Sequence, residues 1–305
     1  MGDSVLRPAP VPYGAMDQDM ASDRGPGVPA LAVPVAQLPR LFSAVAAGYR
    51  RASLRFLPFA ADRLVDRLRP RPGEKVLDVA TGPGTTALAV AQRVQGGGRV
   101  TGIDLAEGMI EVAEAEAQSR GLANADWHVM DGQCLDFRGE YFHAVASTAG
   151  LLYLPDPLAA LREWRRVLRP GGRLLLTTFG RQAFEPMATL LVERLAAAGC
   201  PHLTDDPRFP WHRLAEPGLC QALLEGAGLV DVRVEVLQVG YHLAQADEWW
   251  EVLWHTEMRG LIESLAEDRL GPLRVGHREE VAALATDDGI WMNVETLLVS
   301  ARKPG

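Results

Sequence analysis

Short apolar runs alternate with segments of helical periodicity between residues 74 and 180. The apolar runs predict strands at 75–80, 99–104, 126–130, 143–148 and 172–179. The segments between them predict helices at 85–95, 107–120 and 157–168. Strands that alternate with helices in this way are typical of a parallel sheet with helices on both faces. The sequence therefore predicts an α/β fold built on a doubly wound sheet.

The segments on either side of this region follow other patterns. Residues 1–38 carry six prolines and no sustained apolar period, which predicts a flexible arm. Further elements are expected as a helix at 41–68 interrupted at Pro58, a helix at 185–198, a proline-rich loop at 199–217, a helix at 214–226, a strand at 229–239, a long helix at 246–269 and a last strand at 291–300. We expect residues 39–305 to form one domain, with a mostly helical cap built from about 39–70, 181–225 and 246–285.

Composition narrows the class of partner. The chain has 305 residues, 48% of them hydrophobic, enough for one large domain with a cap. Its formal net charge of −8 argues against nucleic acid as the main partner, because phosphate binding needs a basic surface. No apolar run approaches the roughly 20 residues that span a bilayer. Cys134, Cys200 and Cys220 have no metal-ligand spacing and suit a reducing compartment. We expect a cytoplasmic protein with a small-molecule partner, no membrane span and no metal; a homodimer stays open.

A glycine-rich connection follows the first predicted strand. The run that contains Asp78 turns through Gly82 and Gly84 and then enters an alanine-rich helical segment. Such a loop lets a ligand approach the backbone at a helix N-terminus, where N–H groups have no partner. Asp104 ends the second predicted strand about twenty residues further on, where a carboxylate can accept both ribose hydroxyls of a nucleoside cofactor. The two features together predict a nucleoside-cofactor site.

Three motifs carry a resemblance to a known family. They are Val76-Leu77-Asp78-Val79-Ala80-Thr81-Gly82-Pro83-Gly84, the run Val100-Thr101-Gly102-Ile103-Asp104-Leu105-Ala106-Glu107-Gly108-Met109, and Arg166-Val167-Leu168-Arg169-Pro170-Gly171-Gly172-Arg173-Leu174. The chain resembles class I S-adenosylmethionine-dependent methyltransferases, in the small-molecule branch of ubiquinone/menaquinone C-methyltransferases and secondary-metabolite methyltransferases. The resemblance implies a Rossmann-like seven-stranded sheet in the order 3-2-1-4-5-7-6, with the last strand antiparallel.

The resemblance also implies a cofactor and its contacts. S-adenosyl-L-methionine would be the methyl donor and S-adenosyl-L-homocysteine the product. The residues implied in binding it are Tyr49, Asp78, Ala80, Gly82, Gly84, Asp104, Met109, Asp131, Gln133 and Ser147. Asp78 would order the glycine loop, Asp104 would take the ribose, and Asp131 would accept from the adenine amino group. Two positions depart from the family pattern. Ala80 stands where relatives have glycine, and Arg50 stands where an acid often follows the tyrosine.

The acceptor and the base are less well defined. His202 and His212 lie in the proline-rich loop, and a histidine base would suit methylation of a hydroxyl because its pKa lies near neutrality. The trio Trp249, Trp250 and Trp254 has helical spacing, which favours core packing over an acceptor box. We expect methyl transfer to the oxygen, carbon or nitrogen of a small, partly apolar acceptor, in secondary-metabolite or quinone biosynthesis.

The sequence leaves one other function open and disfavours two more. A cyclase or isomerase of the same fold would bind the cofactor without transferring methyl, and the sequence leaves that alternative open. A short-chain dehydrogenase would need Tyr-x-x-x-Lys, but the residues four positions before Lys75 and Lys303 are Arg71 and Val299. A nucleic-acid base methyltransferase would carry Asn/Asp-Pro-Pro-Tyr/Phe after the fourth strand, where this chain has 147–150, Ser-Thr-Ala-Gly. Both of these classes are disfavoured.

Overall fold

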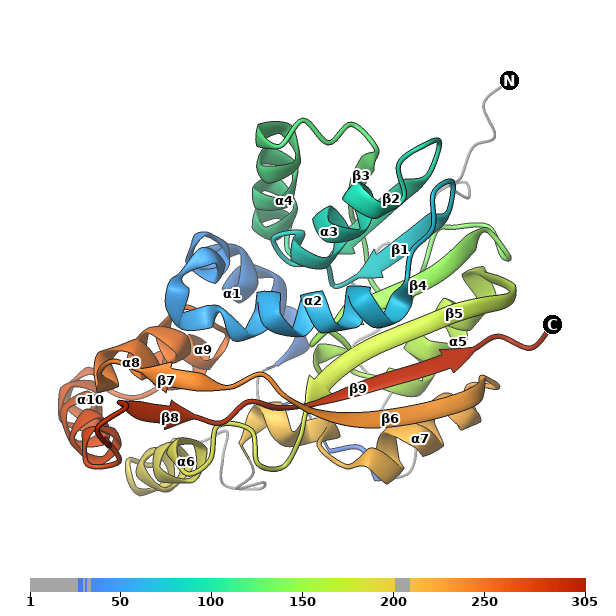
Figure 1. The fold of residues 1–305 in the computed structure, drawn as a ribbon. Coiled ribbons are helices and arrows are strands. Elements are labelled where there is room, and N and C mark those ends of the chain that lie inside the picture. Colours follow the sequence, from blue (N-terminus) through green and yellow to red (C-terminus); the bar gives the residue numbers. More distant parts are fainter. Residues whose placement is uncertain (1–26, 30, 32–33, 201–208) are drawn as a thin grey trace.

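The computed structural model describes residues 27–29, 31, 34–200 and 209–305, so most of the predicted arm lies outside the described residues. Its main element is a seven-stranded sheet in the order β3-β2-β1-β4-β5-β9-β6 (Figure 1). The strands are β1 (Lys75–Val79), β2 (Arg99–Asp104), β3 (Ala125–Val129), β4 (Phe142–Thr148), β5 (Leu168–Phe179), β6 (Val230–Gln238) and β9 (Glu295–Arg302). No helix in the described ranges is long and apolar enough to cross a membrane.

The pairing of the strands confirms the predicted fold. The first five strands of the sheet pair parallel to one another, and β9 pairs antiparallel with both β5 and β6. Because β9 is the seventh strand of this sheet along the chain, the order is the predicted 3-2-1-4-5-7-6. A separate two-stranded ribbon is formed by β7 (Tyr241–Leu243) and β8 (Ile290–Met292).

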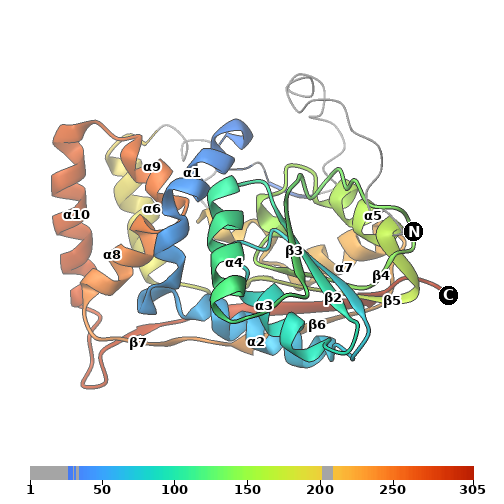
Figure 2. The same ribbon diagram turned by 90° about the horizontal axis from the view of Figure 1, so that it is seen from above.

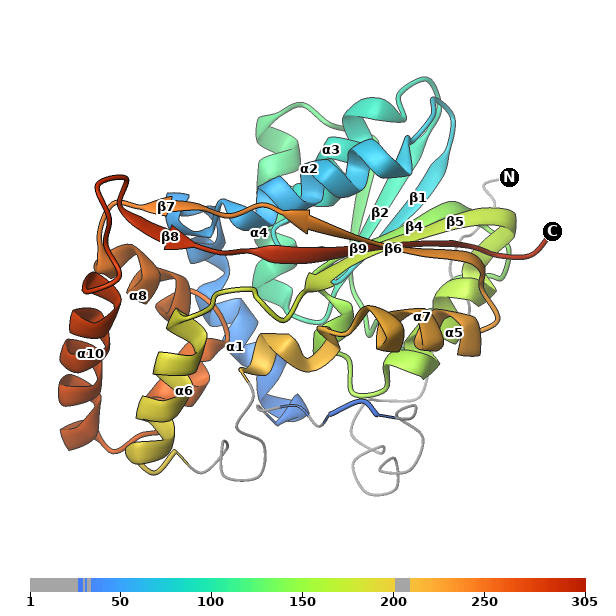
Figure 3. The same ribbon diagram turned by 60° about the horizontal axis from the view of Figure 1, so that its bottom comes forward.

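Helices cover both faces of the sheet. On one face α2 (Phe56–Leu68) and α3 (Thr85–Arg93) bury side chains against β1, β2 and β4. On the opposite face lie α5 (Pro157–Val167) and α7 (Pro217–Gly226). On the same face as α3, α4 (Glu107–Ser119) packs along β2 and β3, with Ala113 beside Gly84 and Trp127. Figure 3 shows α5 and α7 on the side of the sheet away from α2 and α3. Neighbouring residues of each inner strand point to opposite faces, so a continuous apolar strand is buried on both sides.

The cap helices gather beside one end of the sheet. They are α1 (Leu38–Val45), α6 (Met187–Ala197), α8 (Ala246–Trp254), α9 (Met258–Glu263) and α10 (Glu267–Ala282). Figure 2 shows α6, α8, α9 and α10 as one group, with α1 between this group and the sheet. These segments come from far apart in the sequence, and they meet at the sheet end where the site is formed.

Three predicted elements were wrong: two helices of the cap and the last strand. The helix expected at 41–68 breaks before Pro58: α1 ends at Val45 and two short 3-10 turns, 46–50 and 52–54, precede α2. Pro58 is the third residue of α2, where an N–H has no partner within the helix and proline is tolerated. The helix expected at 246–269 is divided into α8, α9 and α10. The strand expected at 291–300 is divided into β8 and β9.

The break after α8 has a local cause. The Thr256 hydroxyl donates to the carbonyl oxygens of Val252 and Leu253, at 2.9 and 3.3 Å, which competes with continuation of the helix. Apolar periodicity runs through this turn without interruption, so the sequence pattern gives no sign of it. The turn directs Glu257 into the interior, where it is 3% exposed.

Trp127 packs under the glycine loop and fixes how close α3 and α4 come to β2. A Cβ added at Gly84 would lie 2.8 Å from the Trp127 ring and 3.0 Å from the Ala113 Cβ. The backbone at Gly84 also has a φ of +83°, which side chains of L-residues rarely adopt. Gly84 is therefore required by packing, whatever its role in ligand binding.

We predict that Gly84→Ala destabilises the protein much more than Gly73→Ala. Gly73 has nearly the same φ, +82°, but an added Cβ would meet no atom within 4 Å, so it is a matched control for backbone strain. Strain alone costs about 1 kcal/mol, and overpacking against Trp127 adds about 1–3 kcal/mol. Urea unfolding of the two variants measures the difference. Equal losses of unfolding free energy would contradict the packing role.

Candidate functional site

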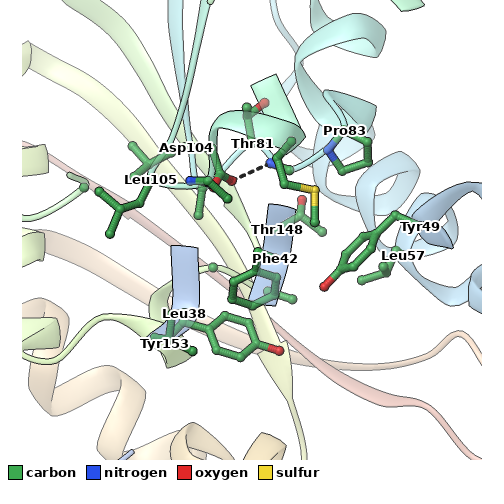
Figure 4. Close-up of a pocket in the computed structure, with 18 of the residues that line it drawn as sticks. Leu38, Phe42, Tyr49, Leu57, Thr81, Pro83, Asp104, Leu105, Thr148 and Tyr153 are labelled. Carbon is green, nitrogen blue, oxygen red and sulfur yellow. Dashed lines mark hydrogen bonds between the residues drawn. The ribbon is translucent and has the colours of Figure 1, made fainter. Parts of the chain in front are cut away.

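A cavity of about 1160 Å³, including the part open to solvent, lies between the strand ends and the cap. One side is formed by the connections after β1, β2 and β4, which is where parallel sheets of this kind bind ligands. The other side is apolar and aromatic, and its residues include Leu38, Phe42, Phe56, Leu57, Leu154, Phe179 and Trp211. Figure 4 shows Tyr49 and Tyr153 directed into the same space from different sides. The cavity therefore has a polar half and an aromatic half.

Asp78 organises the glycine loop from below. Its Oδ2 accepts hydrogen bonds from the Thr81 hydroxyl at 2.6 Å and from the Ala87 N–H at 3.1 Å. Its Oδ1 is buried and has no hydrogen-bond partner among the described residues. Burial raises the pKa of Asp78 to about 7, although both hydrogen bonds act to lower it. The loop is therefore built around a carboxyl group that still lacks one donor.

The loop backbone repeatedly enters the left-handed region. Ala80 has a φ of +52° and Gly82 a φ of +54°. A Cβ added at Gly82 would meet no atom within 4 Å, so this side of the loop is open space. Ala80 adopts the conformation that glycine usually supplies, at a cost of order 1 kcal/mol. The departure from the family pattern at Ala80 therefore leaves the loop geometry intact.

Asp104 lies across the loop from β1. Its Oδ2 accepts from the Gly82 N–H and its Oδ1 from the Ala106 N–H, both at 2.9 Å. Burial raises its pKa above the usual value. Asp104, Met109 and Asp131 all line the cavity, and their contacts to a cofactor stay predictions. Asp131 Oδ1 accepts from the Gln133 N–H at 2.8 Å, which holds the next turn beside the cavity.

Four predicted cofactor residues are not in the cavity wall. Asp78 and Gly84 lie beneath the loop. Gln133 directs its Oε1 to the Asp156 N–H, 2.8 Å away, at the start of α5. Ser147 is fully buried and its hydroxyl has no partner in the described structure. Thr148, the next residue of β4, lines the cavity, because consecutive strand residues face opposite sides. Contacts from these residues to the cofactor stay predictions.

Tyr49 lies in the cavity wall beside Phe42, with ring centroids 6.4 Å apart. Burial, with the negative charges of Glu257 and Asp104, raises the pKa of Tyr49 well above its usual value. The phenol is therefore neutral. The following residue, Arg50, pairs with Glu116 of α4 at 2.7 Å, so its charge is used outside the cavity.

The structure describes one of the two candidate bases. His202 lies outside the described residues. His212 is not part of the cavity wall, and its Nε2 lies 2.7 Å from the Ala183 carbonyl oxygen. Burial lowers the pKa of His212, so the neutral ring donates to that carbonyl. Of the tryptophans, Trp249 and Trp250 are buried in the core, as the helical spacing favours.

Tyr153, Trp211 and Glu257 were not found by sequence reasoning. Tyr153 and Trp211 line the cavity. Glu257 accepts at Oε1 from the Tyr153 hydroxyl, at 2.9 Å, and from Trp211 Nε1. No motif marks these residues, and they come from three distant segments. The only available signal is the single acid in the apolar run 252–262, which reads as one exposed position of a helix.

Comparisons with known proteins agree with this geometry. A family model described as a methyltransferase domain matches residues 76–172. The nocamycin O-methyltransferase of Saccharothrix syringae is 32% identical over 273 residues, which cover 86% of this chain and 97% of that protein. The chain belongs to the S-adenosylmethionine-dependent methyltransferases. It is also 37% identical over 142 residues to aklanonic acid methyltransferase DauC of Streptomyces sp. (strain C5), covering 47% of this chain and 64% of that one.

Solved structures show the same fold for this methyltransferase. The YcgJ protein of Bacillus subtilis is 21% identical with a TM-score of 0.56, and the match covers 81% of this chain and 99% of that one. The [4+2]-cyclase SpnF is 22% identical with a TM-score of 0.54, over 91% and 98% of the two chains. At these identities the likeness concerns the fold alone.

The residues present fit S-adenosylmethionine. The free Oδ1 of Asp78 suits an ammonium group or a water bound to it, and the open side of Gly82 leaves room for the methionine portion. Asp104 offers two carboxylate oxygens for ribose hydroxyls, and Met109 presents a thioether for the adenine ring. When bound, the cofactor supplies an activated methyl group on a sulfonium.

We predict that Asp104→Ala weakens binding of S-adenosylhomocysteine by about 1–3 kcal/mol, because ribose hydroxyls lose their acceptor in a buried site. Isothermal titration calorimetry measures the change. Asp126→Ala is the matched control, since Asp126 lies on the neighbouring strand β3 and pairs with Arg99 at the surface. An affinity unchanged by Asp104→Ala would exclude the ribose role.

Proposed function

We propose that this methyltransferase acts on an oxygen atom of a small, partly apolar acceptor made in secondary metabolism. The observation that carries the proposal is the cavity in which the glycine loop faces an aromatic wall. The sulfonium methyl is already activated, so the chain mainly has to align the acceptor and exclude water. An aromatic enclosure with few polar groups is suited to both tasks.

The aromatic wall is assembled from separate parts of the cap. Phe56, Phe179 and Trp211 pack against one another, with ring centroids 5.4–6.2 Å apart. Phe42 and Tyr153 form another edge-on pair at 5.0 Å. Such a surface favours a flat, conjugated or polycyclic acceptor, because ring faces and edges supply most of the contact.

The relatives favour an oxygen acceptor over quinone carbon. Similarity to nocamycin O-methyltransferase extends through 86% of this chain, whereas similarity to the ubiquinone/menaquinone C-methyltransferase of Ruegeria sp. (strain TM1040) extends through 39%, at 36% identity. Acceptor choice depends on the cap, so the relative that is similar over more of the chain is the better guide. With a net charge of −8, we propose a free small molecule in the cytoplasm and no nucleic acid.

The chain's own residues have distinct tasks in this reaction. Asp78 and the open backbone at Gly82 hold the methionine portion, and Asp104 holds the ribose. Tyr49, in the cavity wall, restricts water. A cyclase of the same fold would use the same enclosure without methyl transfer; the likeness to SpnF concerns the fold alone and does not favour it.

We predict that deleting the gene removes one metabolite from the source strain and accumulates a precursor lighter by one methylene equivalent. Mass profiling of strain extracts measures both changes, and the position of the missing methyl identifies the acceptor atom. Reintroducing the wild-type gene restores the product, and reintroducing the Asp104→Ala variant restores less of it. Accumulation of an isomer of unchanged mass would overturn methyl transfer and indicate a cyclase or isomerase.

A further inference from the structure

A buried carboxyl group stands directly behind the aromatic half of the cavity. Glu257 leaves the turn between α8 and α9 and is 3% exposed. Its Oε1 accepts two hydrogen bonds, from Tyr153 and Trp211, while its Oε2 is buried and has no partner among the described residues. Burying a carboxylate without a cationic partner is costly, so a stable fold rarely keeps one without a use.

Tyr153 connects this carboxyl group to the cavity. Its ring lines the cavity, and its hydroxyl donates its only proton to Glu257 over 2.9 Å. A phenolic oxygen that donates one hydrogen bond can still accept another. The proton of Tyr153 is engaged with a carboxylate, so its oxygen is a stronger acceptor than that of a free phenol. Figure 4 shows the Tyr153 hydroxyl end directed into the space that Tyr49 also faces.

The loop that carries Tyr153 is held rigidly. The Arg213 guanidinium, buried behind it, donates to the carbonyl oxygens of Leu152, Leu154 and Pro155 at 2.7–3.0 Å. Three backbone contacts from one side chain fix the position of the residue between them. Tyr153 therefore presents its oxygen at a defined place, which is what a group that receives a proton from a substrate requires.

We propose that Tyr153, supported by Glu257, binds the hydroxyl of an enol or phenol acceptor and receives its proton during methyl transfer. Tyr153 is then a catalytic residue, and Glu257 is a positioning residue that takes the proton onward. This inference rests on the proposed function and deepens it, because it assigns the base and the kind of hydroxyl that the acceptor carries.

The step balances as follows. The acceptor O–H bond breaks and its electron pair forms the new O–C bond, while the S–C electron pair of the donor returns to sulfur. The acceptor proton moves to the Tyr153 oxygen as the Tyr153 proton moves to Glu257 Oε1, so no tyrosinate is formed. Glu257 ends as a neutral carboxylic acid and returns its proton to solvent after product release.

The electrostatics of the site suit this direction of transfer. Burial raises the pKa of Glu257 to about 7, although the hydrogen bonds from Trp211 and Tyr153 lower it. The titratable side chains that face it are Tyr153 and Tyr49, and the pKa of each is raised well above its usual value, first by burial. Both phenols stay neutral, so Glu257 is the group of this trio that titrates near neutral pH. Its charged form is the proton acceptor, so the rate should rise as pH increases through about 7.

We predict that Tyr153→Phe and Glu257→Gln each lower kcat by about 100-fold, while affinity for S-adenosylhomocysteine stays within about twofold. The acceptor probe is the small-molecule extract of the gene-deleted strain, and the donor is S-adenosylmethionine with a deuterated methyl group. Mass spectrometry follows the labelled product at saturating donor. Asp78 also has a pKa of about 7, and a bound cationic donor would lower it, which separates its titration from that of Glu257. The kcat of wild type should fall as the pH drops below 7, and the kcat of Glu257→Gln should not show this fall. Glu257→Asp should recover part of the rate.

Two matched controls separate chemistry from general damage. Tyr141→Phe removes a hydroxyl and Glu263→Gln removes a carboxylate, and neither residue lines the cavity. Both should keep the wild-type kcat and pH profile. A second readout needs no turnover: para-nitrophenol, whose ionised form is yellow, is added to the S-adenosylhomocysteine complex at pH values around its own pKa, where part of Glu257 is charged and can take the proton. Wild type should increase the ionised fraction, and Tyr153→Phe and Glu257→Gln should not.

The outcomes distinguish the two proposals. If wild-type protein transfers label to an oxygen but Tyr153→Phe and Glu257→Gln keep its kcat and pH profile, the inference is overturned and the proposed function stands. No ionisation of para-nitrophenol by wild type also overturns the inference alone. Label on nitrogen or carbon overturns both the inference and the proposed oxygen acceptor. If wild type binds the donor and transfers no label to any component of the extract, the proposed function fails and the inference fails with it.

Discussion

The architecture of the site depends on the carboxyl group of Asp78, buried at the end of β1. By accepting from Thr81 and Ala87 it ties the loop to the first turn of α3, and so sets where Gly82 and Asp104 lie. Burying that carboxyl group costs free energy that two hydrogen bonds do not fully offset, as its raised pKa shows. A bound donor group that reaches Oδ1 would complete its environment, so cofactor binding and loop order stabilise each other.

The cavity places a second buried carboxyl group, Glu257, behind its aromatic half. The two acids are alike in burial and in a pKa near 7, but they meet different ligands. Asp78 lies under backbone that approaches the cofactor, whereas Glu257 lies behind a phenol that faces the acceptor. Environment, and not residue type, separates their roles, as in other enzymes that use paired carboxyl groups. Each acid has one buried carboxyl oxygen without a hydrogen-bond partner among the described residues.

The sequence predicted the sheet and the loops after β1 and β2 that line the polar half of the cavity, but not the aromatic half. Apolar runs and the residues Asp78, Gly82 and Asp104 follow local rules, because strand, turn and helix cap depend on neighbours in the chain. At the end of β4, Thr148 and not Ser147 lines the cavity; because apolar β4 is buried on both faces, its sequence does not show which side is inward. Tyr153, Trp211 and Glu257 meet only through tertiary packing, which no spacing rule describes.

The cap helices that were wrongly predicted as continuous are broken where they supply residues to the site. Both helices that periodicity predicted as continuous, 41–68 and 246–269, are broken, and the breaks at 46–55 and 255–257 supply Tyr49, Thr256 and Glu257 to the site. A straight helix would bury one stripe and leave the opposite face in water, so it could not turn an acid and its neighbours inward. The irregular backbone is therefore what encloses the acceptor half. The apolar pattern wrongly predicts continuous helices at these positions because tertiary contacts around the cavity outweigh helix propensity there.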